Sequence, residues 1–244
     1  MCGRYRLSYA DRLALVTEFG VDPGEVLFEE FSEVRLGGNP FKPRYNVAPS
    51  QTMPVVLDAV PGKFSLLRWG LVPWFAKDVK FGFQCINARC ETVASKPAFR
   101  EAWKKRHCLV PADGFFEWQK LDAAGKHKQP FNIGMADDEP FAFAGLWENW
   151  RDPAAPPDAE PLRTFTIITG APNELVAPIH DRMPVILPRE KYAAWLSLNT
   201  PPDERAAMLT PFPAERMKAF PISPRVGSPK NDDPAIIEPL RTLL

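Results

Sequence analysis

Seven short apolar segments recur between residues 53 and 169, separated by stretches that contain Gly, Pro and Asp. They cover residues 53–57, 64–69, 107–110, 115–118, 131–135, 141–147 and 165–169. Short apolar runs bounded by turn residues predict β-strands. Most gaps between them are too short for a helix, so the pattern favours a largely antiparallel, curved, barrel-like core over alternating strands and helices.

Helical periodicity is limited to a few stretches outside these segments. Ser8 and Asp11 are spaced like a helix start, and the apolar residues after them predict an amphipathic helix that ends at Gly20. Further helices are predicted over residues 96–105, 190–198 and 203–209. The pattern as a whole predicts an α+β fold in which several helices flank the β core.

Length and composition suit one large domain over residues 1–244, because 45% hydrophobic residues in 244 are enough for a proper core. A Pro- and Ala-rich stretch predicts a loop insertion at 151–162. No apolar run approaches the roughly 18 residues of a membrane span, and no basic-then-apolar signal opens the chain. We therefore expect a cytoplasmic protein that makes no membrane contact.

The four cysteines are too few for a dense disulfide framework in a chain of this size, and we expect them to stay thiols. A zinc site built from Cys85, Cys90, Cys108 and His107 would lack a C-x-x-C pair, and its spacing fits no common zinc module. We expect neither a metal nor an organic cofactor.

The formal net charge is zero, which argues against a protein that coats duplex nucleic acid by bulk electrostatics. One stretch is locally basic: residues 96–106 carry five Lys or Arg against the single acid Glu101, together with Phe99 and Trp103. This stretch is either the solvated face of an amphipathic helix or part of a track for a polyanion.

Cys2 follows the initiator methionine directly. Removal of Met1 would place a free α-amine and a thiol on one residue, and such a 1,2-aminothiol condenses with an aldehyde first to an imine and then to a thiazolidine ring. Reference pKa values near 7.7 for the amine and 8.5 for the thiol make both nucleophiles available near neutrality. The structural alternative is a cysteine that has no role in a frayed terminus.

Several polar residues stand where strand-like runs end, namely Asn46, Asn87, Arg89, Glu117 and His180. Each has an ordinary explanation when taken alone. Asn often closes a turn, Glu117 fits the outward position of an alternating strand, and a histidine is commonly a satisfied structural residue. None of them supports a function by itself.

Six ordered motifs that contain these residues run nearly end to end through the chain. They are CGRY at 2–5, RYNVAP at 44–49, WGLVPW at 69–74, INARCET at 86–92, DGFFEW at 113–118 and IHDRMP at 179–184. In them the chain resembles the SOS-response-associated peptidase (SRAP) family of abasic-site processing proteins. The resemblance implies the SRAP fold and a role in the DNA damage and SOS responses.

The resemblance implies that Cys2 forms a covalent thiazolidine link with the ring-opened aldehyde of an abasic site in single-stranded DNA, which shields the lesion from strand cleavage. It assigns Glu117 as the acid/base and His180 as the partner that opens the sugar or reprotonates during reversal. Both residue types can transfer protons near neutrality. Asn87 suits holding the amine or a sugar hydroxyl, and Arg89 suits gripping a phosphate.

Binding of single-stranded DNA needs stacking surfaces and a charged track. We expect Trp74 or Trp118 to stack on a base or to wedge against a duplex end, which makes junctions of single- and double-stranded DNA a further candidate substrate. Core packing is favoured for Trp69 and Trp147. The residues expected to contact DNA are Arg4, Arg44, Asn46, Trp74, Arg89, Trp118 and Arg182.

Two other functions stay open. In the first, Cys2 is the nucleophile of a cysteine or N-terminal-nucleophile peptidase, in which His180 is the base and Asn87 helps to hold an oxyanion, and the reaction can be limited to processing of the chain itself. In the second, the protein binds single-stranded DNA without a covalent step. An imine at the sugar also brings β-elimination, a lyase reaction, within reach. A bacterial protein with the DNA function would be associated with the nucleoid.

Overall fold

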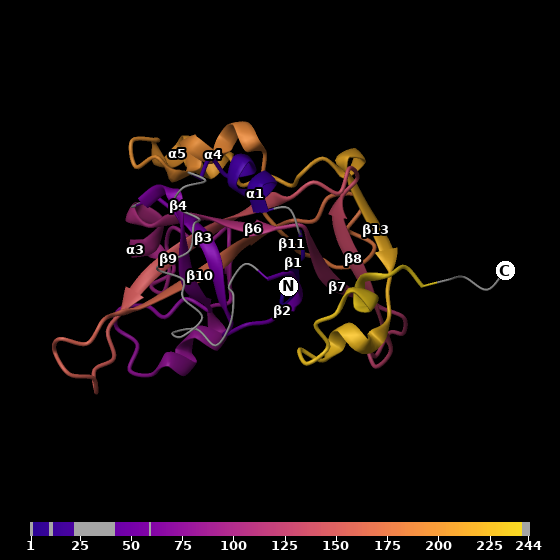
Figure 1. Cartoon of the computed structure of the whole chain (residues 1–244), viewed down its shortest axis with the longest axis horizontal. Helices are drawn as coiled ribbons and strands as arrows, with labels where there is room; N and C mark the ends of the chain where they lie inside the picture. Colours follow the sequence, from indigo (N-terminus) through magenta and orange to yellow (C-terminus); the bar gives the residue numbers. More distant parts are fainter. Residues whose placement is uncertain (1, 10–11, 22–41, 59, 241–244) are drawn as a thin grey trace.

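Five strands form a closed barrel at the centre of the fold (Figure 1). Their order is β10 (Leu162–Gly170), β4 (Val60–Trp69), β3 (Thr52–Leu57), β6 (His107–Ala112) and β9 (Phe141–Trp150), and β9 pairs with β10 to close the ring. The β10–β4 pairing is parallel and the other four are antiparallel. The expected barrel-like, mostly antiparallel core is confirmed.

The computed structural model describes residues 2–9, 12–21, 42–58 and 60–240. A second sheet has the order β13-β8-β7-β1-β2, and three short strands extend the barrel by pairing with β10 or β9. Their bounds are β1 Tyr5–Leu7, β2 Arg44–Val47, β5 Asn87–Arg89, β7 Gly114–Lys120, β8 Lys128–Met135, β11 Met183–Pro184, β12 Ile186–Leu187 and β13 Met217–Pro221.

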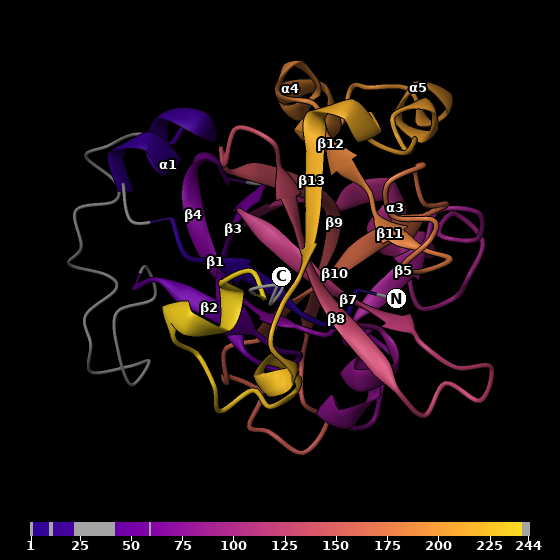
Figure 2. The same cartoon turned by 90° about the vertical axis from the view of Figure 1, so that its right-hand side faces the viewer.

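Short helices surround the sheets. The α-helices are α1 Arg12–Glu18, α3 Arg100–Lys105, α4 Tyr192–Leu196 and α5 Pro202–Ala207, and the 3-10 helices are η1 Val79–Gln84, η2 Arg189–Lys191, η3 Ala214–Arg216, η4 Pro224–Gly227 and η5 Pro234–Ile237. Helices α1, α4 and α5 lie along the same side of the sheets, at the top of Figures 1 and 2. Among the described residues, no helix is long and apolar enough to cross a membrane.

The seven predicted strands are all present, whereas the helices predicted over residues 96–105, 190–198 and 203–209 are each shorter than expected. Helix α3 begins at Arg100 instead of residue 96, and turns occupy the residues before it. Pro97 disfavours helical backbone at residue 96, which precedes it, and the Lys96 carbonyl accepts from the N–H groups of Phe99 and Arg100 at 2.9 Å in the turn before the helix. The strands that the apolar pattern did not predict are short or carry polar residues.

The strands beside Gly145 on β9 leave no room for a side chain at this position. A Cβ atom there would lie 2.7 Å from Cys108 Sγ, 2.9 Å from Val110 Cγ2 and 3.1 Å from the carbonyl oxygen of Thr166. The neighbouring strands β6 and β10 therefore approach β9 as closely as they do only because this position has no side chain.

A second apolar cluster holds the C-terminal segment, residues 222–240, against β7 and β8. Figure 2 shows this segment in yellow beside β2 and β8. Its buried members are Phe116, Ile222, Val226 and Ile236. Because the main barrel core covers the opposite face of β7, both faces of its first four residues are buried, and a polar residue among them is shielded from solvent.

Candidate active site around Cys2

Cys2 is fixed where the two sheets meet. The Phe116 N–H of β7 donates to the Arg4 carbonyl at 3.1 Å, and Asn87 Nδ2 of β5 donates to the Cys2 carbonyl at 2.7 Å. The Cys2 side chain has no exposed surface. The sequence therefore holds the N-terminal residues as an ordered part of the fold, which contradicts the frayed-terminus alternative.

Glu117 lies on β7 with its side chain directed to the same side of the strand as Phe115, which belongs to the barrel core, whereas Phe116 and Trp118 face the C-terminal segment. Only 2% of the Glu117 side chain is exposed. Burial raises the pKa of this carboxyl group to about 7. A carboxyl group of that pKa is present in both protonation states near neutrality, as a general acid or base must be.

His180 follows a series of turns and faces Glu117. Its Nε2 lies 3.8 Å from Glu117 Oε2, and Gln119 Nε2 of β7 donates to the Pro178 carbonyl at 3.0 Å, which ties the turns to the same strand. On the other side of the ring, Nδ1 lies 2.9 Å from Asp181 Oδ1 and 3.0 Å from the Arg182 backbone nitrogen. Burial lowers the pKa of His180 below its usual value.

The thiol of Cys2 is not the ready nucleophile that reference values indicate. Burial, with a smaller effect from the negative charge of Glu117, raises the pKa of this thiol far above its ordinary value. The Sγ atom lies 3.7 Å from the Arg4 carbonyl oxygen. The expectation that the thiol as well as the amine is available near neutrality is therefore corrected: the thiol stays protonated until a base accepts its proton.

Asn87 connects Cys2 to an open cleft of about 670 Å³. The cleft is lined by Gln84, Asn87, Arg89, Thr92, Ser95, Lys96, Pro97 and Phe99. While Nδ2 of Asn87 holds the Cys2 carbonyl, its Oδ1 is buried and has no hydrogen-bond partner among the described residues. The exposed Arg89 and the hydroxyl groups of Thr92 and Ser95 give the cleft the chemistry of a phosphate site.

Asn46 is fully buried, and its Nδ2 donates to the carbonyls of Val226, Ser228 and Asn231 at 2.8–3.1 Å. The predicted DNA contact of Asn46 stays a prediction, while in this structure the side chain has no exposed surface and anchors the C-terminal segment. Arg4 shares this network, since it donates to Asn46 Oδ1 and to two backbone carbonyls of the same segment.

Two other predicted DNA contacts are ion-paired within the protein. Arg44 pairs with Asp232 at 2.7 Å, and Arg182 forms a bidentate pair with Glu91 and also donates to the Thr169 carbonyl. Arg182 nevertheless lies beside the site, because its backbone nitrogen contacts His180. Arg89 differs from both, since it is exposed at the cleft.

Trp69 and Trp147 pack in the core, as the sequence predicted. Trp69 and Trp147 are buried, whereas the Trp74 side chain is 67% exposed and packs edge-on against the exposed ring of Phe75 at 5.7 Å. Trp118 is half-buried against the C-terminal cluster. Trp74 is thus the more accessible of the two predicted stacking surfaces.

In the basic stretch at 96–106, some residues behave as in an ordinary amphipathic helix and one is placed for contact with a polyanion. Phe99 and Trp103 pack into the core, and Arg106 forms an ion pair with the buried Glu148 at 2.6 Å, as in an ordinary amphipathic helix. Lys104 pairs with Glu101 on the surface. Among the five basic residues of the stretch, Lys96 is the one that lines the cleft.

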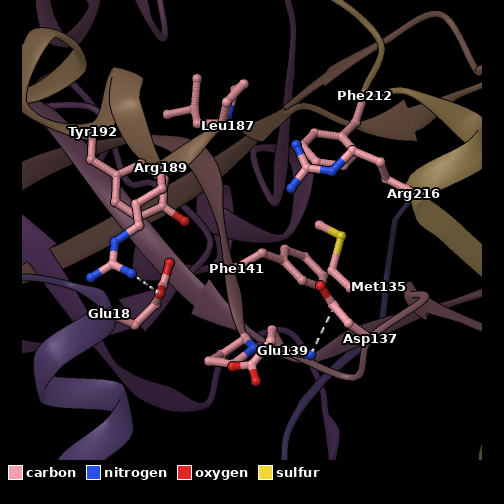
Figure 3. Close-up of a pocket in the computed structure, with 12 residues that line it drawn as sticks. Glu18, Met135, Asp137, Glu139, Phe141, Leu187, Arg189, Tyr192, Phe212 and Arg216 are labelled. Carbon is pink, nitrogen blue, oxygen red and sulfur yellow. Dashed lines mark hydrogen bonds and ion pairs between the residues drawn. The ribbon is translucent and has the colours of Figure 1, made fainter.

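A smaller hollow of about 200 Å³ lies away from these residues, beside α1 and α4 (Figure 3). Glu18 and Arg189 face one another across it at 3.1 Å, and the Arg216 guanidinium lies 5.0 Å from the Phe212 ring centroid. None of the residues predicted to act in chemistry lines this hollow.

The four cysteines are free thiols. Over the described parts of the chain, no three His, Cys, Asp or Glu side chains are gathered as a metal ion would require. His107 lies against Trp103 and Trp195 in the core, where burial lowers its pKa to about 3.

Three acidic residues that the sequence patterns did not single out support the site. Asp113 forms a buried ion pair with Arg6 at 2.9 Å, Asp232 accepts from the backbone of β2, and Asp181 contacts the ring of His180. Asp113 and Asp181 do lie inside the DGFFEW and IHDRMP motifs. Their place in a motif could have identified Asp113 and Asp181 from the sequence, whereas Asp232 lies in none of the six motifs.

Comparison with protein families matches residues 1–229 to the model described as "SOS response associated peptidase (SRAP)". The chain is 42% identical over 240 residues to the abasic site processing protein YoqW of Bacillus subtilis strain 168, with 98% of this chain and 99% of that protein covered. It is 35% identical over 232 residues to the abasic site processing protein HMCES of Gallus gallus, with 82% and 67% covered.

A similar architecture occurs in a crystal structure of a protein from Bacteroides thetaiotaomicron. The TM-score is 0.83 at 29% sequence identity, and the match covers 98% of this chain and all of that one. The five-stranded barrel and the sheet that carries Cys2 therefore belong to an arrangement already seen in a solved relative.

Proposed function

This chain belongs to the SOS response associated peptidase (SRAP) family, and we propose that it processes abasic sites in DNA by forming a covalent bond through Cys2. The observation that carries the proposal is the joint placement of Cys2, Asn87, Glu117 and His180 at one point of the fold. Relatives named as abasic site processing proteins, over nearly the whole length of this chain, support it.

The reaction begins once Met1 is removed. The α-amine of Cys2 attacks the aldehyde carbon of the ring-opened deoxyribose, the resulting carbinolamine loses water, and an iminium forms. The Cys2 sulfur then adds to the same carbon while its proton leaves to a base, which closes the thiazolidine ring. Starting from the ammonium form of the amine, the balance is one thiazolidine, one water and one released proton.

Glu117 is the proton carrier for these steps. A carboxyl group with a pKa of about 7 accepts a proton from the attacking amine, returns it to the departing oxygen, and can accept the proton of the buried thiol in the last step. The raised pKa of the Cys2 thiol supports attack by the amine first, because the protonated sulfur is the weaker nucleophile until a base accepts its proton.

Asn87 holds the nucleophile in register. Its Nδ2 fixes the Cys2 carbonyl, and its unpartnered Oδ1 suits an N–H of the Cys2 amine or a hydroxyl group of the sugar. His180, which faces Glu117, is placed to assist opening of the sugar ring and to return a proton when the link reverses.

The DNA strand would follow the cleft that begins at Asn87. Arg89 and Lys96 supply positive charge there, and Thr92 and Ser95 supply hydroxyl donors for phosphate oxygens. The exposed ring of Trp74 offers a stacking surface or a wedge at a junction of single- and double-stranded DNA. Local charge in the cleft permits DNA binding although the net charge of the chain is zero.

The peptidase alternative has less support. An activated cysteine nucleophile needs a lowered pKa or a histidine base in contact with its sulfur. Burial raises the pKa of the Cys2 thiol, and the His180 ring contacts Glu117, Asp181 and the Arg182 backbone nitrogen. Turnover of an unrelated peptide that is lost in Cys2→Ala would favour the hydrolase over the DNA reaction.

The experiment that tests the proposal is denaturing gel electrophoresis after incubation with single-stranded DNA that contains one abasic site. We expect a slowly migrating adduct for the wild-type protein, and none with undamaged DNA or with Cys2→Ala. Retention of DNA only under native conditions would favour the non-covalent alternative.

A further inference from the structure

One ring nitrogen of His180 has two neighbours with opposite requirements. The Arg182 backbone N–H donates to Nδ1 at 3.0 Å, which needs a lone pair on that nitrogen. Asp181 Oδ1 lies 2.9 Å from the same Nδ1, and an ionised carboxylate only accepts, so that contact needs a proton on Nδ1. A single protonation state of the ring cannot satisfy both neighbours.

The two neighbours therefore stabilise different forms of the ring. When the proton of neutral His180 is on Nε2, Nδ1 accepts from the Arg182 N–H. When the proton is on Nδ1, or when the ring is cationic, the protonated Nδ1 lies 2.9 Å from the Asp181 carboxylate, which stabilises that form by its negative charge. The ring can change protonation state without turning, because each form already has a partner in place.

These contacts connect the buried site to solvent. Glu117, 3.8 Å from Nε2, has 2% of its side chain exposed, whereas Asp181 on the opposite side of the ring is 89% exposed. His180 lies between them with 26% of its side chain exposed. A proton that enters the ring at Nε2 and leaves from Nδ1 has moved from the closed site to the surface.

We propose that Asp181 is a positioning residue that completes a proton relay from Glu117 through His180 to solvent. Protonated Glu117 gives its proton to Nε2, and the resulting imidazolium releases the proton on Nδ1 toward Asp181 and water. This leaves the Nε2–H tautomer, which the Arg182 N–H stabilises. The catalytic use of the relay rests on the proposed function, since thiazolidine formation releases one proton, but the relay itself does not.

The charged groups around His180 determine in which direction its pKa changes when Asp181 is replaced. Burial is the main cause of its lowered pKa, Lys120 on β7 and the chain's amino terminus lower it further, and Asp181 raises it. Glu117 faces Nε2, and Arg182 is neutralised by its pair with Glu91. Removal of the Asp181 charge should therefore lower the pKa of His180.

The direct test is NMR titration of the imidazole nitrogens in ¹⁵N-labelled protein without DNA. The chain has three histidines, so His180→Gln identifies the His180 signals. We expect Asp181→Asn to lower the His180 pKa by roughly half a unit and to shift the neutral ring toward the Nε2–H tautomer. Asp181→Glu should restore both, and the exposed Asp158→Asn should change neither. Unchanged pKa and tautomer in Asp181→Asn would overturn the relay.

The kinetic test uses single-stranded DNA that carries one abasic site. We expect Asp181→Asn to slow adduct formation by about tenfold at unchanged DNA affinity and to shift its pH profile to lower pH. A loss of affinity with an unchanged rate at saturation would contradict the relay and place Asp181 on the DNA surface. If wild-type protein forms no adduct, the proposed function fails, while the titration still decides the relay.

Discussion

His180 Nε2 lies 3.8 Å from Glu117 Oε2. Burial moves the two groups in opposite directions, because it raises the pKa of the carboxyl group to about 7 and lowers that of the imidazole. The carboxyl group therefore gains basicity while the imidazole loses it, so the two groups exchange a proton on terms that differ from those in water. Formation of an imine and a thiazolidine needs such a pair, since each step moves a proton to or from the reacting atoms.

Glu117→Gln should still bind DNA but should form the covalent adduct slowly. The amide has the same shape but cannot carry a proton, so we expect adduct formation to slow by about 100-fold or more at unchanged DNA affinity. Single-turnover kinetics on denaturing gels measure the rate, and the exposed Glu160→Gln is the matched control. An unchanged rate in Glu117→Gln would assign the proton transfers to another group.

The same substitution should stabilise the fold above neutral pH. Between the usual pKa of 4.5 and the native value of about 7, folded protein holds a proton that unfolded protein has lost, so the free energy of unfolding falls as pH rises. Glutamine removes this penalty. We expect the free energy of unfolding of Glu117→Gln to exceed that of the wild-type protein by about 2 kcal/mol at pH 8, and to differ little from it at pH 4. Urea denaturation at both pH values tests this, and equal effects at the two would contradict it.

Cys2→Ser should separate the two stages of the covalent reaction. Serine keeps the α-amine, so the imine still forms, but closure to an oxazolidine is less favourable than closure to a thiazolidine. We expect less stable adduct and relatively more strand scission by β-elimination. Gels that resolve adduct from cleaved DNA give both yields, and an unchanged adduct yield in the serine variant would mean that the sulfur is unimportant.

Neutralising the cleft should weaken binding through the phosphates. We expect Arg89→Gln and Lys96→Gln each to lower affinity for single-stranded DNA and to reduce the slope of log affinity against log salt by about 0.7. Lys104→Gln, on an exposed lysine paired with Glu101, is the control. Fluorescence anisotropy over a salt series measures the slopes, and a slope unaffected by both cleft variants would exclude this path.

Gly145→Ala tests the barrel packing. The added methyl group meets Cys108 Sγ at 2.7 Å and Val110 Cγ2 at 2.9 Å, so we expect a loss of about 2 to 3 kcal/mol in the free energy of unfolding. Gly227→Ala is the matched control, because nothing lies within 4 Å of its added Cβ. Equal stability of the two variants in thermal denaturation would show that β9 relaxes without cost.

The sequence predicted the barrel better than the surroundings of the site. Strands such as β9 are apolar along their length, and burial of that surface alone specifies them. Strands β1, β2 and β5 are short and partly polar, and they form because Cys2, Asn46 and Asn87 find hydrogen-bond partners far along the chain. Such long-range pairing leaves no periodic signal.

Contacts between residues far apart in the chain also explain what the sequence did not predict at the site. Motifs identified Cys2, Asn87, Glu117 and His180 as residue types suited to one reaction, but not that burial would raise the pKa of the Cys2 thiol. That burial depends on packing between two sheets. Asn46 looked like a polar residue at the end of a strand, and only the position of the C-terminal segment makes it a buried anchor.

Closure of a thiazolidine by Cys2 on the abasic-site sugar can be seen directly by intact mass spectrometry of the adduct. We expect one species that lacks Met1 and has the summed mass of protein and abasic DNA minus one water, absent with undamaged DNA and with Cys2→Ala. Wild-type protein that has lost Met1 and still gives no such species would contradict the claim.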